Sequence, residues 1–246
     1  MKRKWIAAFL TCVMVFALSV TAFAATPAAT AAQKLDNLGL FQGMGNNADG
    51  TPNYGLDQTP TRAQAVTMLV RLLGKEQEAQ NSTYSAPFTD VADWAKPYVN
   101  YAYKNGLTNG TSATTFGGNA AIKPTEYLTF VLRALGYTSG TDFQWNSAWT
   151  LTDKLGVTSG EYNANTTAFT RGNVASISFD ALSASKKNTT TPLYQSLINA
   201  GVFTEAQAER AGLKEGNTST TKVEATSVKL NQTSVTLEEG ETVALS

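Results

Sequence analysis

Three segments of the chain share the hydrophobic spacing of an amphipathic helix. Apolar residues recur at positions i, i+3, i+4 and i+7 in the segments 61–74 and 123–136, and this spacing places them on one helical face. The segment 170–182 follows the same pattern, but Ala175 and Ser178 stand at two of the four places. We therefore predict three helices, the third with a poorer apolar face. The apolar positions are Val66, Leu69, Val70 and Leu73 in the first segment, Leu128, Val131, Leu132 and Leu135 in the second, and Phe179 and Leu182 in the third.

Local signals mark the ends of these helices. Thr61 and Gln64 have the spacing of a capping box, in which each side chain binds the backbone N–H of the other residue. Arg62 is then the first residue of its helix. Gly74 and Gly136 follow the first two helices, at the position where a glycine commonly ends a helix.

A second pattern precedes each predicted helix. The segments LDNLGLFQG (35–43), YAYKNGLTNG (101–110) and LTDKLGVTSG (151–160) each contain a helix end, a glycine, a hydrophobic residue, two further residues and a glycine. The repeated unit is therefore a helix, a glycine-rich loop and a capped helix. One such unit cannot bury its own apolar stripe, so we expect the units to pack together. A partial fourth copy at 197–213 ends in a short helix, predicted from a capping box that begins at Thr204.

The second unit is the most complete and carries a family resemblance. Its sequence FTDVADWAKPYV (88–99), with the segment that follows it up to residue 137, resembles the S-layer homology (SLH) repeat of bacterial cell-surface proteins. That family opens with F-x-D…W-A, continues with G-[IL]-x-x-G and a Phe, and ends with T-R-A-E before a helix that finishes R-A-L-G. The resemblance covers roughly 30–213. The matching residues are Phe88, Asp90, Trp94, Ala95, Gly106, Gly110, Phe116, Arg133 and Gly136.

The resemblance implies a fold and a function. Three SLH repeats form a mainly helical, pseudo-threefold bundle, and the grooves between its lobes bind secondary cell-wall polysaccharide, often through a terminal pyruvylated sugar. This binding is non-covalent and anchors an exported protein to the wall. The arginine of the T-R-A-E motif is a principal groove residue of the family. We accordingly expect a mainly α fold with SLH repeats at 30–80, 86–139 and 141–213.

The T-R-A-E motif takes a different form in each unit. It reads T-R-A-Q at 61–64 and T-R-G-N at 170–173, whereas K-P-T-E stands at 123–126. Pro124 thus replaces the arginine in the second unit, and Lys123 offers a cation one position earlier. The three grooves are therefore not expected to be equivalent. The predicted glycan-binding residues are Thr61, Arg62, Gln64, Trp94, Lys123, Glu126, Thr170 and Arg171.

Arg62 is the one residue of its helix start for which the sequence offers no structural role. A cation at the first helical position is unfavourable by about 0.3–1 kcal/mol, because the helix dipole is positive there. An arginine can hold a planar carboxylate such as a pyruvyl group with two hydrogen bonds, while the free N–H groups of the helix end add donors. The alternative is that Arg62 points into water or pairs with a carboxylate such as Asp57.

Three tryptophans are further candidates for contact with a sugar ring. Trp94 shares a predicted helical face with Tyr98 and Tyr101, so burial in the core is the favoured interpretation and stacking on a sugar is the alternative. Trp145 and Trp149 lie four residues apart, and we expect them to share one helical face and to pack inside the third unit.

The composition excludes several function classes. The chain has 19 Lys and Arg, 19 Asp and Glu, and no histidine. The balanced charge gives no electrostatic footprint for nucleic acid, and the lack of histidine excludes Ser-His-Asp and Cys-His catalysis and histidine metal sites. The loop 43–57 is similar in composition to a calcium loop, but Gly45 and Leu56 occupy the first and last ligand positions of an EF-hand. We expect no enzyme activity, no cofactor and no metal site.

The N-terminal segment 1–24 is predicted to be a secretory signal peptide. Three basic residues at 2–4 precede an apolar run over 5–20 and the sequence A-F-A at 22–24. A single transmembrane anchor is the alternative. The only cysteine, Cys12, lies inside the apolar run, so the mature protein would form no disulfide. Removal of the segment leaves 16 Lys and Arg against 19 Asp and Glu, a net charge of −3.

The C-terminal part of the chain changes in composition. Residues 214–226 are polar and are predicted to be a linker. Apolar and polar residues then alternate over 227–246, which predicts short β-strands and resembles the start of a bacterial Ig-like (group 2) domain. The expected fold class is therefore a helical bundle followed by the first strands of a β-sandwich. A sandwich needs about 100 residues, so the chain is interpreted as a fragment of a longer protein.

The sequence thus favours a non-catalytic module that anchors an exported protein to a bacterial cell wall or surface layer by binding secondary cell-wall polysaccharide. One alternative is a structural S-layer or adhesin subunit that acts by assembly or by surface contact. A second alternative is the targeting part of a wall-active enzyme whose catalytic domain is missing. Neither nucleic acid nor, once the signal peptide is removed, a membrane is an expected partner.

Overall fold

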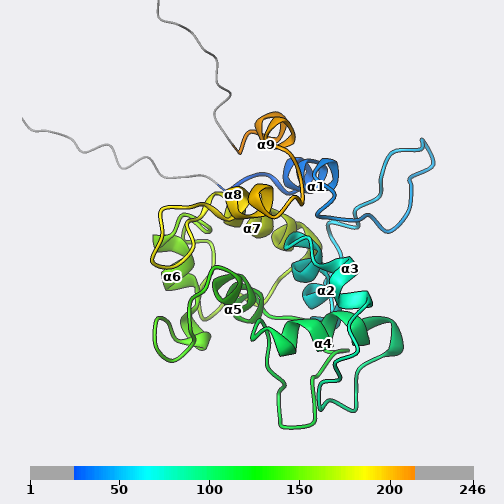
Figure 1. Ribbon diagram of the computed structural model, residues 1–246, viewed down its shortest axis with the longest axis vertical. Helices are drawn as coiled ribbons and strands as arrows, with labels where there is room; N and C mark the ends of the chain where they lie inside the picture. The colour runs from blue at the N-terminus through cyan, green and yellow to red at the C-terminus, as the bar shows by residue number, and fades with distance from the viewer. Residues whose placement is uncertain (1–24, 214–246) are drawn as a thin grey trace, which may run out of the picture.

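The computed structural model describes residues 25–213. The predicted signal peptide at 1–24, the linker at 214–226 and the Ig-like segment at 227–246 lie outside the described residues. Within 25–213 the chain folds into helices joined by loops (Figure 1). The helices are α1 (Ala28–Asn37), α2 (Arg62–Leu72), α3 (Glu76–Gln80), η1 (Asp93–Ala95), α4 (Lys96–Lys104), α5 (Pro124–Ala134), η2 (Trp145–Ser147), α6 (Trp149–Lys154), α7 (Arg171–Ser183), α8 (Leu193–Asn199) and α9 (Glu205–Ala211), where η marks a 3₁₀-helix.

The expected fold class is wrong in its β part. The described residues contain isolated β-bridges, such as that between Thr61 and Ala121, but neither a strand nor a sheet. The physical reason is that each pairing is a single bridge, such as that of Asn46 with Pro52 inside one loop, and is not continued into a ladder. The fold of residues 25–213 is helical, as expected for the SLH part.

Three helices pack against one another at the centre of the molecule. They are α2, α5 and α7, which correspond to the three segments predicted from the apolar spacing. Each is covered by a helix from a different unit: α4 packs on α2, α6 on α5, and α1 on α7 (Figure 1). The first described helix therefore closes the ring by packing on a helix that lies more than a hundred residues later in the chain.

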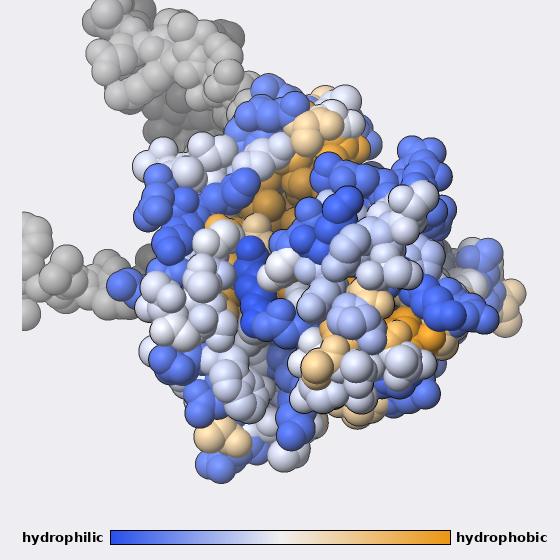
Figure 2. Space-filling model, turned by 60° about the horizontal axis from the view of Figure 1, so that its bottom comes forward, coloured by the Kyte–Doolittle hydropathy of each residue, from blue (hydrophilic) through white to orange (hydrophobic). Residues whose placement is uncertain are grey.

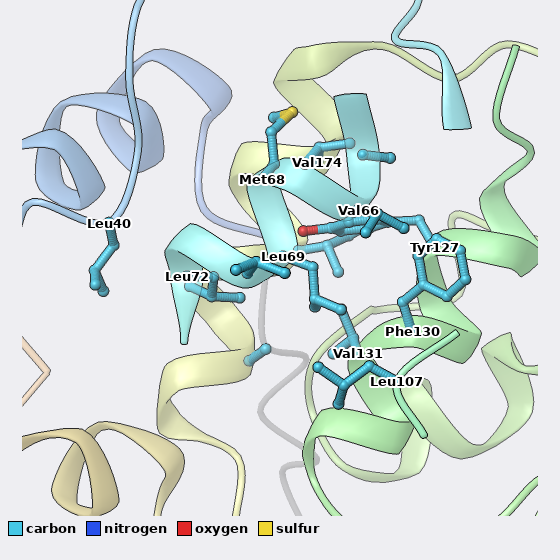
Figure 3. Close-up of a cluster of buried hydrophobic side chains, with 14 of the residues drawn as sticks. Leu40, Val66, Met68, Leu69, Leu72, Leu107, Tyr127, Phe130, Val131 and Val174 are labelled. Atoms are coloured by element: carbon cyan, nitrogen blue, oxygen red, sulfur yellow. The ribbon is translucent and has the colours of Figure 1, made fainter. Parts of the chain in front are cut away.

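The apolar faces of the three central helices form the core. Val66 and Leu69 of α2 lie beside Tyr127 and Phe130 of α5, and all four are at least 99% buried (Figure 3). The poorer face of α7 has a packing explanation. Ser178 stands where a larger apolar residue was expected, and its hydroxyl forms a 2.6 Å hydrogen bond with the Tyr127 hydroxyl. A small polar residue suits that position because the buried Tyr127 hydroxyl needs a hydrogen-bond partner there.

Glycines end the first helix of each unit, as predicted. Gly39, Gly106 and Gly156 have φ angles of 73°, 69° and 71°, in the left-handed region that glycine adopts without strain. The next residue in each case donates its N–H back to the helix, at 2.8, 2.8 and 2.9 Å, and buries a hydrophobic side chain. These residues are Leu40, Leu107 and Val157.

The F-x-D opening of the second unit has a structural role. Asp90 accepts the backbone N–H groups of Phe116 and Gly117 at 2.7 and 2.8 Å, which ties the entry to α4 to the loop before α5. Burial raises the pKa of Asp90, but these hydrogen bonds lower it by more, so the pKa lies below its usual value of 3.8.

The helices of the described part are short. None of those between residues 25 and 213 has the length and apolar character needed to cross a bilayer. The face shown in Figure 2 is largely hydrophilic, and its most hydrophobic residues lie in patches between raised hydrophilic parts.

Candidate functional site

Capping boxes set the positions of the two arginines of the T-R motifs. The Gln64 N–H donates to the Thr61 hydroxyl at 3.2 Å, and the Thr61 N–H donates to the Gln64 side chain at 2.9 Å. Asn173 and Thr170 make the same pair of bonds, at 3.3 and 2.8 Å. The predicted box at Thr61 is confirmed, as is the one at Thr204, whereas the box at Thr170 was not predicted. The boxes at Thr61 and Thr170 fix Arg62 and Arg171 as the first residues of α2 and α7.

The start of each of these helices also docks on a loop of another unit. The N–H groups of Arg62 and Ala63 donate to Ala120 and Gly118 at 2.8 and 3.0 Å. Arg171 and Gly172 donate in the same way to Gln58 and Leu56, both at 2.8 Å. These N–H groups are therefore occupied by the fold. The expectation that the helix end adds free donors for an anion is wrong, and only the arginine side chains remain for that task.

The guanidinium of Arg62 is buried between α2 and α5. Its Nη1 donates to Glu126 Oε1 at 2.6 Å, and its Nη2 donates to the carbonyl oxygen of Asn109 at 2.9 Å. Its Cζ lies 5.1 Å from the ring centroids of both Phe116 and Phe130, within the range of cation–π attraction. Burial lowers the pKa of Arg62, and the charge and hydrogen bond of Glu126 oppose this shift. Arg62 is thus a structural cation whose Nη1 and Nη2 atoms both bind acceptors of the protein.

Arg171 occupies the corresponding place between α7 and α2, with a different set of partners. Its Nε and Nη2 donate to the carbonyl oxygens of Tyr54 and Gln42 at 2.9 and 3.1 Å. Its Nη1 lies 3.6 Å from the sulfur of Met68, which is a weak acceptor. Its Cζ lies 5.4 Å from the Phe41 ring centroid. Burial lowers the pKa of Arg171, and the charge of Arg71 adds to that shift. Within residues 25–213 no carboxylate forms an ion pair with Arg171.

Each arginine lies at one groove. The Arg62 groove is a cavity of about 510 Å³, and the Arg171 groove is a cavity of about 450 Å³. The Arg62 groove is lined by Arg62, Asn109, Gly110, Thr111, Glu126, Thr129, Phe130, Arg133, Ser139 and Trp145. The Arg171 groove is lined by Gln64, Thr67, Met68, Arg71, Trp94, Tyr98 and Arg171.

The two grooves are built from matching positions of α2 and α5. The 62-residue interval between the first two units pairs four lining residues of one groove with four of the other. The pairs are Gln64 with Glu126, Thr67 with Thr129, Met68 with Phe130, and Arg71 with Arg133. The main chemical difference is that an amide in the Arg171 groove stands where the Arg62 groove has a carboxylate.

Polar atoms without a hydrogen-bond partner are concentrated in the Arg62 groove. Arg62 Nε and Thr129 Oγ1 are the buried side-chain atoms without a partner in the described part of the chain. Both residues line this groove. An unpaired buried donor or acceptor costs about 1–3 kcal/mol, so natural proteins retain few of them.

The tryptophans lie at the groove edges and not in the core. Trp94 is 54% exposed and Trp145 is 59% exposed. The expectation that both are buried is wrong, because each lies in a short 3₁₀-helix ahead of its α-helix and is therefore off the buried face. The neighbouring Ala95 and Ala148 take the buried positions. Trp149 begins α6 and packs against the core as predicted.

The predicted site residues are therefore divided among the two grooves, the helix caps and the exposed surface. Arg62 and Glu126 meet in one groove, whereas Arg171, Gln64 and Trp94 meet in the other. Thr61 and Thr170 act as caps and do not line either groove. Lys123 is exposed at the start of α5 and lines neither groove.

Several groove residues, Asn109, Arg71 and Arg133 among them, were missed by reasoning from the sequence. Asn109 gave no signal beyond its residue type. Arg71 and Arg133 did give one, since they recur at the same place in V-R-L-L-G and L-R-A-L-G. The interpretation of Arg62 also changes, because its ion partner is Glu126 and not Asp57.

A metal centre is not indicated by the side chains that the structure describes. Among residues 25–213, no three or more His, Cys, Asp or Glu side chains gather closely enough to hold an ion. The chemistry of the two grooves is that of arginines, amides, hydroxyls and exposed indoles.

Comparison with known proteins gives this geometry a context. Residues 87–123 match the family model described as "S-layer homology domain". A "Cell surface protein" of Thermoanaerobacter kivui is 35% identical over 156 residues, which are 58% of this chain and 19% of the relative. A "Middle cell wall protein" of Brevibacillus brevis is 30% identical over 195 residues, 73% of this chain and 18% of the relative. A "Surface layer protein" of Brevibacillus choshinensis is 32% identical over 140 residues, 56% of this chain and 12% of the relative.

These relatives are much longer proteins, and this chain spans less than a fifth of the length of each. The family match and the relatives confirm the predicted location at the bacterial cell wall or cell surface. Residues 87–123 of the chain thus match the S-layer homology domain, and the chain is similar to bacterial cell-surface proteins.

Proposed function

We propose that this chain anchors an exported protein to the bacterial cell wall by binding wall polysaccharide in the grooves beside α2. The observation that carries the proposal is the Arg171 groove. There a guanidinium without an ion partner lies in the same cavity as the exposed ring of Trp94. A cation beside an exposed aromatic face suits a sugar that carries a carboxylate, such as a pyruvylated sugar.

Arg171 retains donors for such a ligand. Three of its five guanidinium N–H groups have an acceptor within residues 25–213, and one of those acceptors is the weak sulfur of Met68. The remaining N–H groups, with the side-chain amide of Gln64 and the hydroxyl of Thr67, supply the groove with hydrogen-bonding partners for sugar oxygens. We assign Arg171, Gln64 and Trp94 to glycan binding, and Thr61 and Thr170 to the support of the arginines.

The division into SLH repeats at 30–80, 86–139 and 141–213 is part of the same proposal. The cyclic packing of α4 on α2, α6 on α5 and α1 on α7 supports it, because each lobe then combines helices from two units. The S-layer homology match and the names of the relatives support a non-catalytic role for the chain.

Co-sedimentation with purified walls tests the proposal. Walls of the bacterium that carries the chain would be used intact and after chemical removal of their secondary polysaccharide. We expect the full chain to pellet with the intact walls and to stay in the supernatant with the stripped walls. Equal retention on both preparations would exclude polysaccharide as the anchor.

A second candidate function is that of a subunit of a surface lattice. One relative is named "Surface layer protein", and this favours assembly as a role of the longer protein. Electron microscopy and light scattering of the purified chain separate the two functions. Ordered two-dimensional arrays that form without any glycan would favour the role of a lattice subunit. A monomer that binds polysaccharide would favour the role of a wall anchor.

A further inference from the structure

A second arginine of the Arg62 groove lies at the junction of two cavities. Arg133, near the end of α5, lines the Arg62 groove of about 510 Å³. It also lines a neighbouring cavity of about 360 Å³, which includes Gly106, Gly136, Tyr137 and Thr138. The two cavities share Asn109, Arg133 and Ser139. The guanidinium of Arg133 therefore borders two adjacent cavities.

Arg133 lacks an ion partner within residues 25–213. In the described part of the chain its guanidinium donates to the side chain of Asn109, in the amide orientation that satisfies both ends of that side chain. Oδ1 then accepts from Arg133 Nη2 at 3.1 Å, and Nδ2 donates to the carbonyl oxygen of Thr108 at 3.0 Å. Burial lowers the pKa of Arg133, and the positive charge of Arg62 adds to that shift. An arginine stays charged in proteins despite such a shift, so this cation is uncompensated.

The matching arginine of the first unit is compensated. Arg71 donates from Nε and Nη2 to Glu76 Oε1 at 3.0 and 2.8 Å. The 62-residue interval places Thr138 at the position of Glu76. Thr138 is exposed and lines the smaller cavity beside Arg133. The second unit has therefore lost the carboxylate that neutralises this arginine in the first unit.

The charges of the two grooves are arranged in opposite ways. In the Arg62 groove, Arg62 at the start of α2 forms an ion pair with Glu126, and Arg133 has no carboxylate partner. In the Arg171 groove, Arg171 at the start of α7 has no carboxylate partner, and Arg71 forms an ion pair with Glu76. Within residues 25–213, each groove thus has one guanidinium without a carboxylate partner. This guanidinium lies at opposite ends of the two grooves.

We infer that Arg133, and not Arg62, binds the anionic group of the ligand in the Arg62 groove. This inference rests on the proposed function and names the ligand class as a sugar that bears a carboxylate. The carboxylate binds at Arg133, in the depression shared by the two cavities, and the sugar ring extends toward the exposed Trp145. Arg62 stays with Glu126 and supports the fold. The carboxylate therefore binds near the C-terminal end of α5 in the Arg62 groove, whereas it binds near the N-terminal end of α7 in the Arg171 groove.

Calorimetric titration of the full chain tests this assignment. The probes are a methyl glycoside that carries a pyruvyl ketal and the methyl ester of the same compound, which has no charge. We expect the wild type to bind two equivalents of the acid, and to bind the ester about ten-fold more weakly or worse, because the charge-assisted bonds are lost. Arg133→Gln and Arg171→Gln should each leave one site, and the double variant should leave none.

Thr138→Glu provides a test that keeps the arginine in place. It supplies Arg133 with the carboxylate that Arg71 has in Glu76, and it changes an exposed residue. We expect it to remove the same site as Arg133→Gln. Lys75→Gln, at an exposed ion pair outside both grooves, is the matched control for a lost positive charge and should keep both sites.

Two results would overturn the inference and leave the proposed function standing. One is that Arg133→Gln and Thr138→Glu both still bind two equivalents of the acid with unchanged affinity. The other is a wild type that binds isolated wall polysaccharide but not the acidic glycoside. A wild type that binds neither the glycoside nor the polysaccharide contradicts the proposed function itself.

Discussion

Arg62 on α2 reaches Glu126 on α5, and their Nη1 and Oε1 atoms lie 2.6 Å apart in a largely buried ion pair. Glu126 also accepts the backbone N–H of Lys123 at 2.8 Å, so one carboxylate both caps α5 and holds the arginine of α2. The pair therefore joins two of the three central helices. A residue that the sequence presented as a ligand-binding cation is, in the structure, a connection between lobes.

The first prediction concerns the stability that this pair provides. Arg62→Met should lower the free energy of unfolding by about 2–4 kcal/mol, because it leaves a carboxylate partly buried without its partner. Glu126→Gln should cost less, about 1–2 kcal/mol, since an amide still accepts a hydrogen bond from the arginine. Urea denaturation of both single variants and the double variant gives the coupling energy. A double variant whose loss equals the sum of the two single losses would show that the pair is not coupled.

The second prediction concerns pH. Burial raises the pKa of Glu76, but the hydrogen bonds from Arg71 and Tyr98 lower it by more, so the folded pKa lies below the usual 4.5. Ionised Glu76 therefore stabilises the fold at pH values above about 4.5, and this contribution is lost as the pH falls further through the folded pKa. We expect Glu76→Gln to be less stable than the wild type by roughly 1 kcal/mol near pH 6.

The difference between the two proteins should shrink steadily below pH 4.5. Thermal unfolding of wild type and Glu76→Gln between pH 3 and pH 7 measures it. Glu78→Gln, at an exposed ion pair on the same short helix, serves as the control. A stability difference that does not change over this range would contradict a lowered pKa.

The third prediction concerns the buried hydroxyl pair of Tyr127 and Ser178, whose oxygens lie 2.6 Å apart. Tyr127→Phe should cost about 1–3 kcal/mol, because the Ser178 hydroxyl loses its partner inside the core. Adding Ser178→Ala should recover much of that loss, since no unpaired hydroxyl then remains. Guanidinium denaturation of Tyr127→Phe, Ser178→Ala and the double variant checks this, and a double variant less stable than Tyr127→Phe would contradict it.

The fourth prediction separates binding from folding at the groove edges. Trp94→Ala removes an indole that is 54% exposed, so its cost in unfolding free energy should stay within about 0.5 kcal/mol. The same change should weaken wall retention several-fold, because a sugar ring loses its stacking surface. Trp149→Ala is the contrasting variant, since Trp149 packs against the core and its loss should destabilise the fold. If Trp94→Ala keeps full wall retention, the Arg171 groove is not the binding surface.

Features with a local cause were predictable from the sequence. The helix positions follow from apolar spacing within each segment. The capping boxes at Thr61 and Thr204 involve residues three positions apart, and the glycine ends of the helices need only a left-handed φ angle. None of these features depends on how the three units are placed relative to one another.

Features that depend on contacts between units were not predictable in the same way. The partner of Arg62 is 64 residues away in the chain, and sequence spacing gives no hint of that contact. The exposure of Trp94 depends on a one-turn 3₁₀-helix that shifts it off the face of α4. The predicted start of a β-sandwich concerned residues outside the described part, and the described part has no strand.

The central claim is that the chain is held on the wall by polysaccharide in its grooves. The most direct measurement is release of wall-bound wild-type chain by soluble polysaccharide purified from the same walls, with an uncharged dextran of similar size as the control. The account predicts that the purified polysaccharide displaces the chain in a concentration-dependent way and that dextran does not. A chain that stays on the wall at saturating polysaccharide, or that dextran displaces equally well, would contradict it.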